Sequence, residues 1–234
     1  MIKPTLKMNA LAPVLAGLLA LAGLAPAADA QEVRGDAAAG GRKIDMCIGC
    51  HGIVGYQASF PEVYKVPKIS GQGAKYIASA LNAYKAGERK HPSMRGIAAS
   101  LTDQDIADLS AYYELQGRQG DPQPVPATPA RQPDAQVQAL LAKGVCVTCH
   151  GANFSTPADP AYAKLAGQNA DYLYMALRAY KTDKNPQFGR TNGVMAGVVK
   201  PFSNAELKAL AGYIGSLPGE LRTLPESRFH IGGR

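Results

Sequence analysis

Two stretches of the chain carry the same pattern of apolar and polar positions. In each stretch five apolar side chains fall at i, i+1, i+4, i+5 and i+8, a spacing that lines one face of an α-helix. They are Tyr76, Ile77, Ala80, Leu81 and Tyr84, and then Tyr172, Leu173, Ala176, Leu177 and Tyr180. No run shows convincing alternation with the period of two that marks a half-buried strand. The pattern predicts an all-α fold.

A further helix is predicted later in each stretch. Thr102-x-x-Asp105 and Ser203-x-x-Glu206 are capping boxes, with Asp in place of Glu in the first. The apolar positions that follow predict the buried faces: Ile106, Leu109, Tyr112 and Tyr113, and then Leu207, Leu210, Tyr213 and Ile214. We expect about three main helices in each stretch, with long irregular loops between them.

Both stretches belong to an internal repeat. Cys47-x-x-Cys50-His51-Gly52 returns 99 residues later as Cys146-x-x-Cys149-His150-Gly151. The turn Ile69–Gln72 returns at an offset of 96 as Leu165–Gln168, and Leu101–Tyr113 returns at 101 as Phe202–Ile214. The changing offset means that matched helices are joined by loops of unequal length. The chain is therefore a duplicated domain, with copies near 35–118 and 134–217.

A proline-rich segment separates the copies. Prolines at this density cannot occupy a helix interior and favour an extended spacer; they are Pro122, Pro124, Pro126, Pro129 and Pro133. Such a linker would hold the copies at a limited range of separations without fusing their cores. The predicted organisation is a signal peptide (1–30), a first domain (31–118), the linker (119–133), a second domain (134–217) and a C-terminal tail (218–234).

The first thirty residues have the features of an export signal. Lys3 and Lys7 precede an apolar run, and Ala28-Asp29-Ala30 supplies small residues before a cleavage point. The alternative is a retained membrane anchor, although the run is near the lower length limit for spanning and is interrupted by Pro and Gly. We expect cleavage and export to the periplasm.

Composition and charge narrow the function classes. Hydrophobic residues make up 46% and charged residues 18%, which argues against a disordered chain. The formal net charge is +7, but the basic residues are scattered, so we expect no nucleic-acid partner. Trp is absent, and a copy of about 84 residues buries only a modest core. Domains of this size commonly need a metal, a disulfide or another stabilising group.

The repeated cysteine motif indicates which group this is. Thiols at i and i+3 and an imidazole at i+4 lie on one side of a helical turn. Both thiols can then bond to the vinyl edge of a haem while the imidazole reaches the iron, and Cys-x-x-Cys-His is the attachment signature of c-type haem. We predict two covalently attached haem c groups, on Cys47 and Cys50 with His51, and on Cys146 and Cys149 with His150.

Other uses of these cysteines fit the pattern less well. A four-thiolate zinc site would place its pairs about 15–20 residues apart, whereas Cys50 and Cys146 are 96 apart in different copies. A thioredoxin-like redox pair needs a βαβ setting and leaves both histidines unexplained. Two short disulfides remain as a third alternative for an exported protein.

Matched methionines are the candidates for the second axial ligand. Met94 and Met195 correspond across the repeat and are expected in loops before the final helix. His/Met ligation raises the potential of a haem, as in cytochromes c. His91 competes with Met94, but its counterpart Asn192 cannot ligate iron in that way, so Met94 is preferred. Met175 lacks a matched methionine and is expected to pack in the core.

The chain from about residue 35 to 217 resembles the cytochrome c4 family, di-haem proteins built from two class I cytochrome c domains. The resemblance rests on the paired haem motifs, the Gly71-Gln72 and Gly167-Gln168 turns, the distal methionines and the stretch Leu101–Leu109. It implies that a carbonyl accepts the proximal imidazole N–H, from Pro67 in one copy and from Ala163 in the other. It also implies that the haem propionate edges approach across the domain interface.

The same resemblance implies a function. These proteins shuttle electrons from a quinol-oxidising complex to a terminal oxidase, which would give redox-protein partners and peripheral association with membrane complexes. An iron with both axial positions filled has no site for substrate, so we expect no enzyme activity. The alternatives are a cytochrome subunit of a periplasmic dehydrogenase and, with less support, a haem enzyme such as a peroxidase. His230, in the unmatched tail, is expected at the surface.

Overall fold

The computed structural model describes residues 33–119, 124–182 and 184–225. The predicted signal peptide, Pro122 and His230 lie outside these residues. Within them, no helix combines the length and apolarity needed to cross a membrane.

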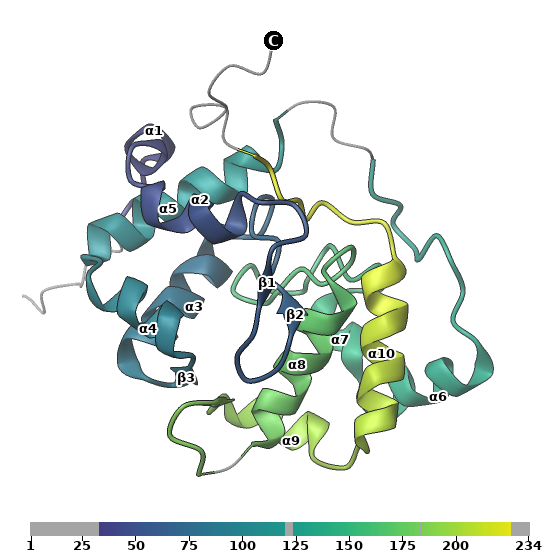
Figure 1. Ribbon diagram of the computed structural model, residues 1–234. Coiled ribbons are helices and arrows are strands. Elements are labelled where there is room, and N and C mark those ends of the chain that lie inside the picture. Colours follow the sequence, from purple (N-terminus) through teal and green to yellow (C-terminus); the bar gives the residue numbers. More distant parts are fainter. Residues whose placement is uncertain (1–32, 120–123, 183, 226–234) are drawn as a thin grey trace, which may run out of the picture. The chain divides into compact units, whose positions relative to one another are not determined.

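Each copy is built from five helices among the residues described (Figure 1). In the first copy these are α1 (Ala37–Gly41), α2 (Asp45–His51), α3 (Ala74–Ala86), α4 (Pro92–Ala99) and α5 (Asp103–Gln116). In the second they are α6 (Ala135–Lys143), α7 (Cys146–His150), α8 (Ala170–Lys181), α9 (Gly193–Val199) and α10 (Asn204–Ser216). The predicted all-α class and the tandem repeat are confirmed, although the short helices raise the number above the three expected.

The strands are minimal. The first copy forms a hairpin from β1 (Gln57–Ala58) and β2 (Tyr64–Lys65). Strand β3 (Arg89–Lys90) of the first copy pairs antiparallel with β4 (Gly189–Arg190) of the second. These two-residue pairings are too short to give a periodic sequence pattern, which is why the sequence did not reveal them.

The final helices begin where the sequence predicted. Both capping boxes are formed, by Thr102 with Asp105 at the start of α5 and by Ser203 with Glu206 at the start of α10. A lysine from the first helical region of each copy pairs with the same capping acid: Lys43 lies 2.7 Å from Asp105, and Lys143 lies 3.1 Å from Glu206. In each copy an ion pair thus connects the end of the first helix, or the residues just after it, to the start of the last helix.

The two apolar cores differ in size. The larger core, in the second copy, consists of Val137, Leu140, Leu141, Phe154, Ala166, Leu173, Val199, Phe202, Leu207, Leu210, Ala211, Tyr213, Ile214 and Leu217. The smaller, in the first copy, consists of Ile44, Ile48, Ile77, Leu101, Ile106, Leu109 and Tyr113. In the first copy α1 also crosses α5 so closely that a Cβ on Gly40 would lie 2.1 Å from the backbone oxygen of Asp108. The first copy buries fewer apolar side chains of its own.

A third cluster joins the copies, so the expectation of unfused cores is wrong at this place. Tyr64 of the first copy packs against Met175, Ala179 and Phe188 of the second. In Figure 1 the β1–β2 hairpin lies against α8, in agreement with the contacts of β2. The expected packing role of Met175 is confirmed, but its packing partners come from both copies.

The linker and the C-terminal tail also make contacts with the two copies. In the linker, the Pro126 and Arg131 carbonyls accept hydrogen bonds of 2.9 Å from Asn153 and from the Tyr213 hydroxyl. In the tail, the backbone N–H of Arg222 donates to Ser70 of the first copy at 2.9 Å. Neither interaction could be predicted from composition, because both depend on where the segments run in space.

We expect a buried aspartate, Asp108, to make the first copy sensitive to acid. Asp108 accepts hydrogen bonds of 2.7–2.8 Å from the Asp36 backbone, Lys43 and Gln104. Burial alone would raise its pKa, but these donors hold the pKa below its ordinary value. A lowered folded-state pKa stabilises the fold above the unfolded pKa, near 3.9, and this contribution is lost as the pH falls through the folded value.

We expect Asp108→Asn to lower the free energy of unfolding at pH 7 by about 1–3 kcal/mol, because a buried donor loses a charged acceptor. The decline of stability as the pH falls below about 5 should also become shallower. Urea denaturation at a series of pH values measures both effects. Asp103→Asn is the matched control, since this side chain is 81% exposed. An unchanged pH slope in Asp108→Asn would contradict the prediction.

Candidate metal centres

The two Cys-x-x-Cys-His motifs form short helices, as predicted. Cys47, Cys50 and His51 lie in α2, and Cys146, Cys149 and His150 make up α7 with the residues between them. All four thiols are free. Burial raises the pKa of Cys47 and Cys146, so these two groups are protonated at neutral pH. The structure therefore presents two thiol pairs, one in each copy, and the two pairs are not combined in one site.

Each motif histidine is oriented by a backbone carbonyl. The Nδ1–H of His51 donates to Pro67, and that of His150 donates to Ala163, both at 2.9 Å. The carbonyl acceptors suggested by the family resemblance are thus confirmed in both copies. Burial lowers the pKa of both imidazoles below 6.5, which favours their neutral form. With Nδ1 carrying the proton, Nε2 keeps the lone pair that a metal requires.

The matched methionines lie in short helices, which corrects the expectation of loops. Met94 is the third residue of α4 and Met195 the third residue of α9. His91 and Asn192 cap these helices, accepting the backbone N–H of Met94 at 3.4 Å and of Met195 at 3.0 Å. The sequence offers a polar residue three positions before each methionine, but the two helices are too short to show a period.

His91 has structural partners at both ring nitrogens. Nδ1 accepts the Met94 backbone N–H, and Nε2 lies 3.0 Å from the buried Tyr64 hydroxyl. Asn192 takes the same capping position in the second copy. Helix capping therefore accounts for both His91 and Asn192. The methionine side chains are only partly packed, and Met195 is half-buried against the second core.

Two arginines that the sequence analysis overlooked meet between the copies. Arg89 and Arg190 are paired residues of β3 and β4, and Arg190 is only 8% exposed. Each guanidinium lies over two tyrosine rings, at 5.2 and 5.8 Å for Arg89 and at 5.8 and 5.3 Å for Arg190. Among the residues described, no carboxylate pairs with either guanidinium. The repeat could have pointed to these two arginines, because each stands five residues before a matched methionine.

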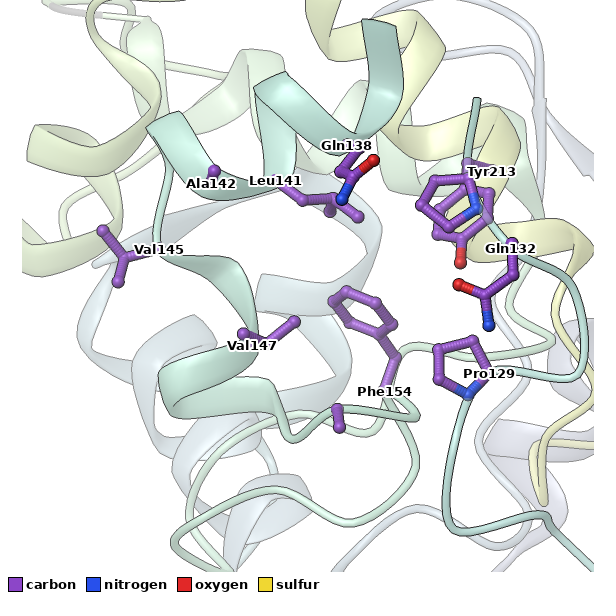
Figure 2. Close-up of a pocket in the computed structure, with 11 residues that line it drawn as sticks. Pro129, Gln132, Gln138, Leu141, Ala142, Val145, Val147, Phe154 and Tyr213 are labelled. Carbon is purple, nitrogen blue, oxygen red and sulfur yellow. The ribbon is translucent and has the colours of Figure 1, made fainter. Parts of the chain in front are cut away.

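A pocket lies away from these residues. It has a volume of about 310 Å³ and lies where the linker folds against α6, α7 and α10. Figure 2 shows the Phe154 ring pointing into it, with Pro129 and Tyr213 at its side. None of the motif cysteines, motif histidines or matched methionines lines this pocket, so it is a feature of the linker contact.

The donor set fits a metal carried by a porphyrin. In the part of the chain that the structure describes, no three His, Cys, Asp or Glu side chains gather as a protein-held metal site would require. What each copy offers is a pair of free thiols, a neutral imidazole with fixed orientation and a methionine. Those groups suit covalent attachment of haem and axial ligation of its iron.

Comparison with known proteins gives matches over both copies. A family model described as Cytochrome c matches residues 37–114 and 121–218. A relative named Cytochrome c4 from Pseudomonas aeruginosa is 32% identical, over 90% of this chain and 100% of its own. A relative named Thiosulfate dehydrogenase electron acceptor from Stutzerimonas stutzeri is 32% identical, over 88% of this chain and 94% of its own.

The solved structures agree with this result. The structure of reduced recombinant cytochrome c4 from Pseudomonas stutzeri matches with a TM-score of 0.58 and 28% identity. The match covers 79% of this chain and 100% of that one. The similarity therefore extends over most of the chain and over the whole of the solved structure.

Proposed function

This chain belongs to the cytochrome c family, in its di-haem cytochrome c4 group, and we propose that it carries electrons in the periplasm from a quinol-oxidising complex to a terminal oxidase. Two covalently bound haem c groups and a role as electron carrier come with the family. The periplasmic location rests on the predicted signal peptide, residues 1–30. The domain boundaries, 31–118 and 134–217, remain the sequence prediction.

We assign the haem contacts by residue. Cys47 and Cys50 would attach the first haem, with His51 and Met94 as axial ligands. The second haem would be held by the equivalent residues, Cys146, Cys149, His150 and Met195. The supporting observation is the orientation of both imidazoles by a backbone carbonyl at 2.9 Å, which leaves Nε2 available in each copy. A haem supplies a one-electron ferric/ferrous couple at a potential that His/Met ligation raises.

Arg89 and Arg190 are the residues suited to the haem propionates. Their guanidinium groups remain charged at any physiological pH, and buried charges need partners of opposite sign. Their hydrogen-bond partners are tyrosine hydroxyls, Tyr76 at 3.3 Å and Tyr172 at 3.0 Å. Burial would raise the pKa of Tyr76, but Arg89 and Arg190 lower it below its ordinary value, whereas burial raises the pKa of Tyr172 to about 12. Propionate carboxylates would provide the missing anions, and both arginines lie where β3 and β4 join the copies.

Electron carriage rather than catalysis follows from this assignment. With the histidine and the methionine of each copy both holding the iron, no position would be left for a substrate, and all four cysteines would be used in attachment. Each matched methionine lies on a helix with a side-chain cap, and each motif histidine is held by a backbone carbonyl at 2.9 Å. A rigid ligand set changes little between oxidation states, which suits transfer to and from another protein.

The relative named Thiosulfate dehydrogenase electron acceptor supports a second candidate. It covers 88% of this chain, against 90% for the Cytochrome c4 relative from Pseudomonas aeruginosa, and both are 32% identical to it. In this version the chain accepts electrons from a periplasmic dehydrogenase and has the same haem chemistry. Only the donor differs.

The test is a reduction and reoxidation assay on the purified di-haem protein. We expect oxidation of both haems on mixing with membranes that contain a terminal oxidase, and slow or no turnover with peroxide or thiosulfate alone. Reduction by thiosulfate only when a thiosulfate dehydrogenase is added would support the second candidate. Rapid turnover of peroxide by the protein itself would contradict the assignment as a carrier.

A further inference from the structure

Two buried glutamines exchange hydrogen bonds between the copies. Gln72 accepts the backbone N–H of Lys164 at 2.9 Å and donates to the carbonyl of the same residue at 3.0 Å. Gln168 does the same with Lys68, at 2.9 Å for both bonds. The side chains are almost fully buried, at 4% and 5% exposure. Each copy therefore holds one residue of the other by both of its backbone groups.

Lys164 and Lys68, which the two glutamines bind, each follow the residue whose carbonyl binds a motif histidine. The N–H of Lys164 and the C=O of Ala163 belong to one peptide group, and this C=O accepts the Nδ1–H of His150. In the other copy the N–H of Lys68 and the C=O of Pro67 form the peptide group that binds His51. An unbroken series of hydrogen bonds runs from each imidazole, through one peptide, to a glutamine of the opposite copy.

The orientation of both amides is fixed by a second donor. Gln72 Oε1 also accepts the Gly73 N–H at 3.0 Å, and Gln168 Oε1 accepts the Asn169 N–H at 2.9 Å. A reversed amide would place its NH₂ group against two N–H donors. These hydrogen bonds therefore place the amide oxygen, and not the nitrogen, beside the peptide group that binds the histidine of the opposite copy. We call that peptide group and its two hydrogen bonds the relay.

We propose that Gln72 and Gln168 are positioning residues, each of which lowers the redox potential of the haem in the opposite copy. Hydrogen bonds in series polarise one another, with a strengthening of about 10–30% per bond. An acceptor on the peptide N–H makes the carbonyl oxygen more negative, and it then draws more strongly on the Nδ1–H. The imidazole becomes a more basic ligand, which favours ferric iron.

This inference rests on the proposed function, because it requires His51 and His150 as iron ligands. It goes further by making the potential of each haem depend on a side chain of the other copy. A domain that only packed against its neighbour would have no such crossed dependence.

The test uses the full di-haem protein with Gln72→Leu or Gln168→Leu. A redox titration followed by NMR of the haem methyl signals resolves the two haems. We expect Gln72→Leu to raise the potential of the second haem more than that of the first, and Gln168→Leu to give the reverse. The Nδ1–H of the opposite histidine should also exchange faster with solvent, because its hydrogen bond is weaker.

Two further variants separate tuning from loosening of the interface. Gln72→Glu keeps an acceptor oxygen, so the second haem should stay at or below its wild-type potential; a general loosening would raise it as in Gln72→Leu. Thr191→Val removes an exposed cross-domain bond to the Glu88 carbonyl, 3.3 Å long and separate from the relay, and should move neither potential.

The outcomes distinguish the two levels of the proposal. Equal shifts of both haems, a shift confined to the variant's own domain, or no shift would overturn the crossed dependence while leaving the haem assignment intact. An unmutated protein without two His/Met-ligated haems would overturn the proposed function, and this inference with it.

Discussion

Replacing Cys47 and Cys50 together by serine is expected to leave one haem per chain and to unfold the first domain. The first copy has the smaller apolar core of the two, and a covalently held haem would supply much of its buried apolar surface. The second domain, with its larger core and its own thiols, should keep its haem and its helices. Haem content per chain, circular dichroism and limited proteolysis measure these three effects.

The matched control for this prediction lies between the same two cysteines. Gly49 is exposed and a Cβ there would meet nothing within 4 Å, so Gly49→Ala should keep both haems. A double serine variant that still carried two covalent haems would show that attachment does not depend on these thiols. A variant with one haem and a protease-resistant first domain would show that this domain folds without its haem.

Replacing Met94 or Met195 by histidine is expected to cause the largest change in redox behaviour. Axial ligands set haem potentials over a range of roughly 0.8 V, and exchange of the thioether for an imidazole lowers the potential. Each variant should lower one of two redox transitions substantially and remove about half of the methionine–iron charge-transfer band near the red end of the oxidised spectrum. Redox titration and absorption spectroscopy check both points.

Met175→Leu is the comparison for these variants. This side chain is 5% exposed and packs between the copies, so its loss should reduce stability slightly and leave the band unchanged. His91→Asn tests the competing ligand in the first copy. It keeps a helix cap, because asparagine is the capping residue at the equivalent position of the second copy. If His91 were the ligand, the first haem would contribute nothing to a methionine–iron band. An unchanged band in Met94→His, with a shifted redox transition in His91→Asn, would therefore reverse the ligand assignment.

Features that depend on neighbouring residues could be predicted from the sequence. The capping boxes at Thr102 and Ser203, the apolar faces of the last helices and the cysteine motifs each lie within a few turns of chain. The repeat added further weight, because the same local pattern occurred twice. The same reasoning missed α4 and α9, which are too short to show a period.

Features that join the copies could not be predicted. The Gly-Gln turns were visible as a repeated motif, but the sequence does not reveal that Gln72 and Gln168 reach the opposite copy. Arg89 and Arg190 also stood at matched positions, yet their meeting depends on how the domains pack. Local spacing carries no information about which surfaces face each other.

The exchange through Gln72 and Gln168 follows the rule of an isologous interface, in which residue i contacts j and the equivalent of j contacts the equivalent of i. The pairing of Arg89 with Arg190, equivalent residues on antiparallel strands, obeys the same pseudo-symmetry. A single-domain ancestor with this surface would assemble as a homodimer about a two-fold axis, and duplication with fusion would preserve that contact within one chain.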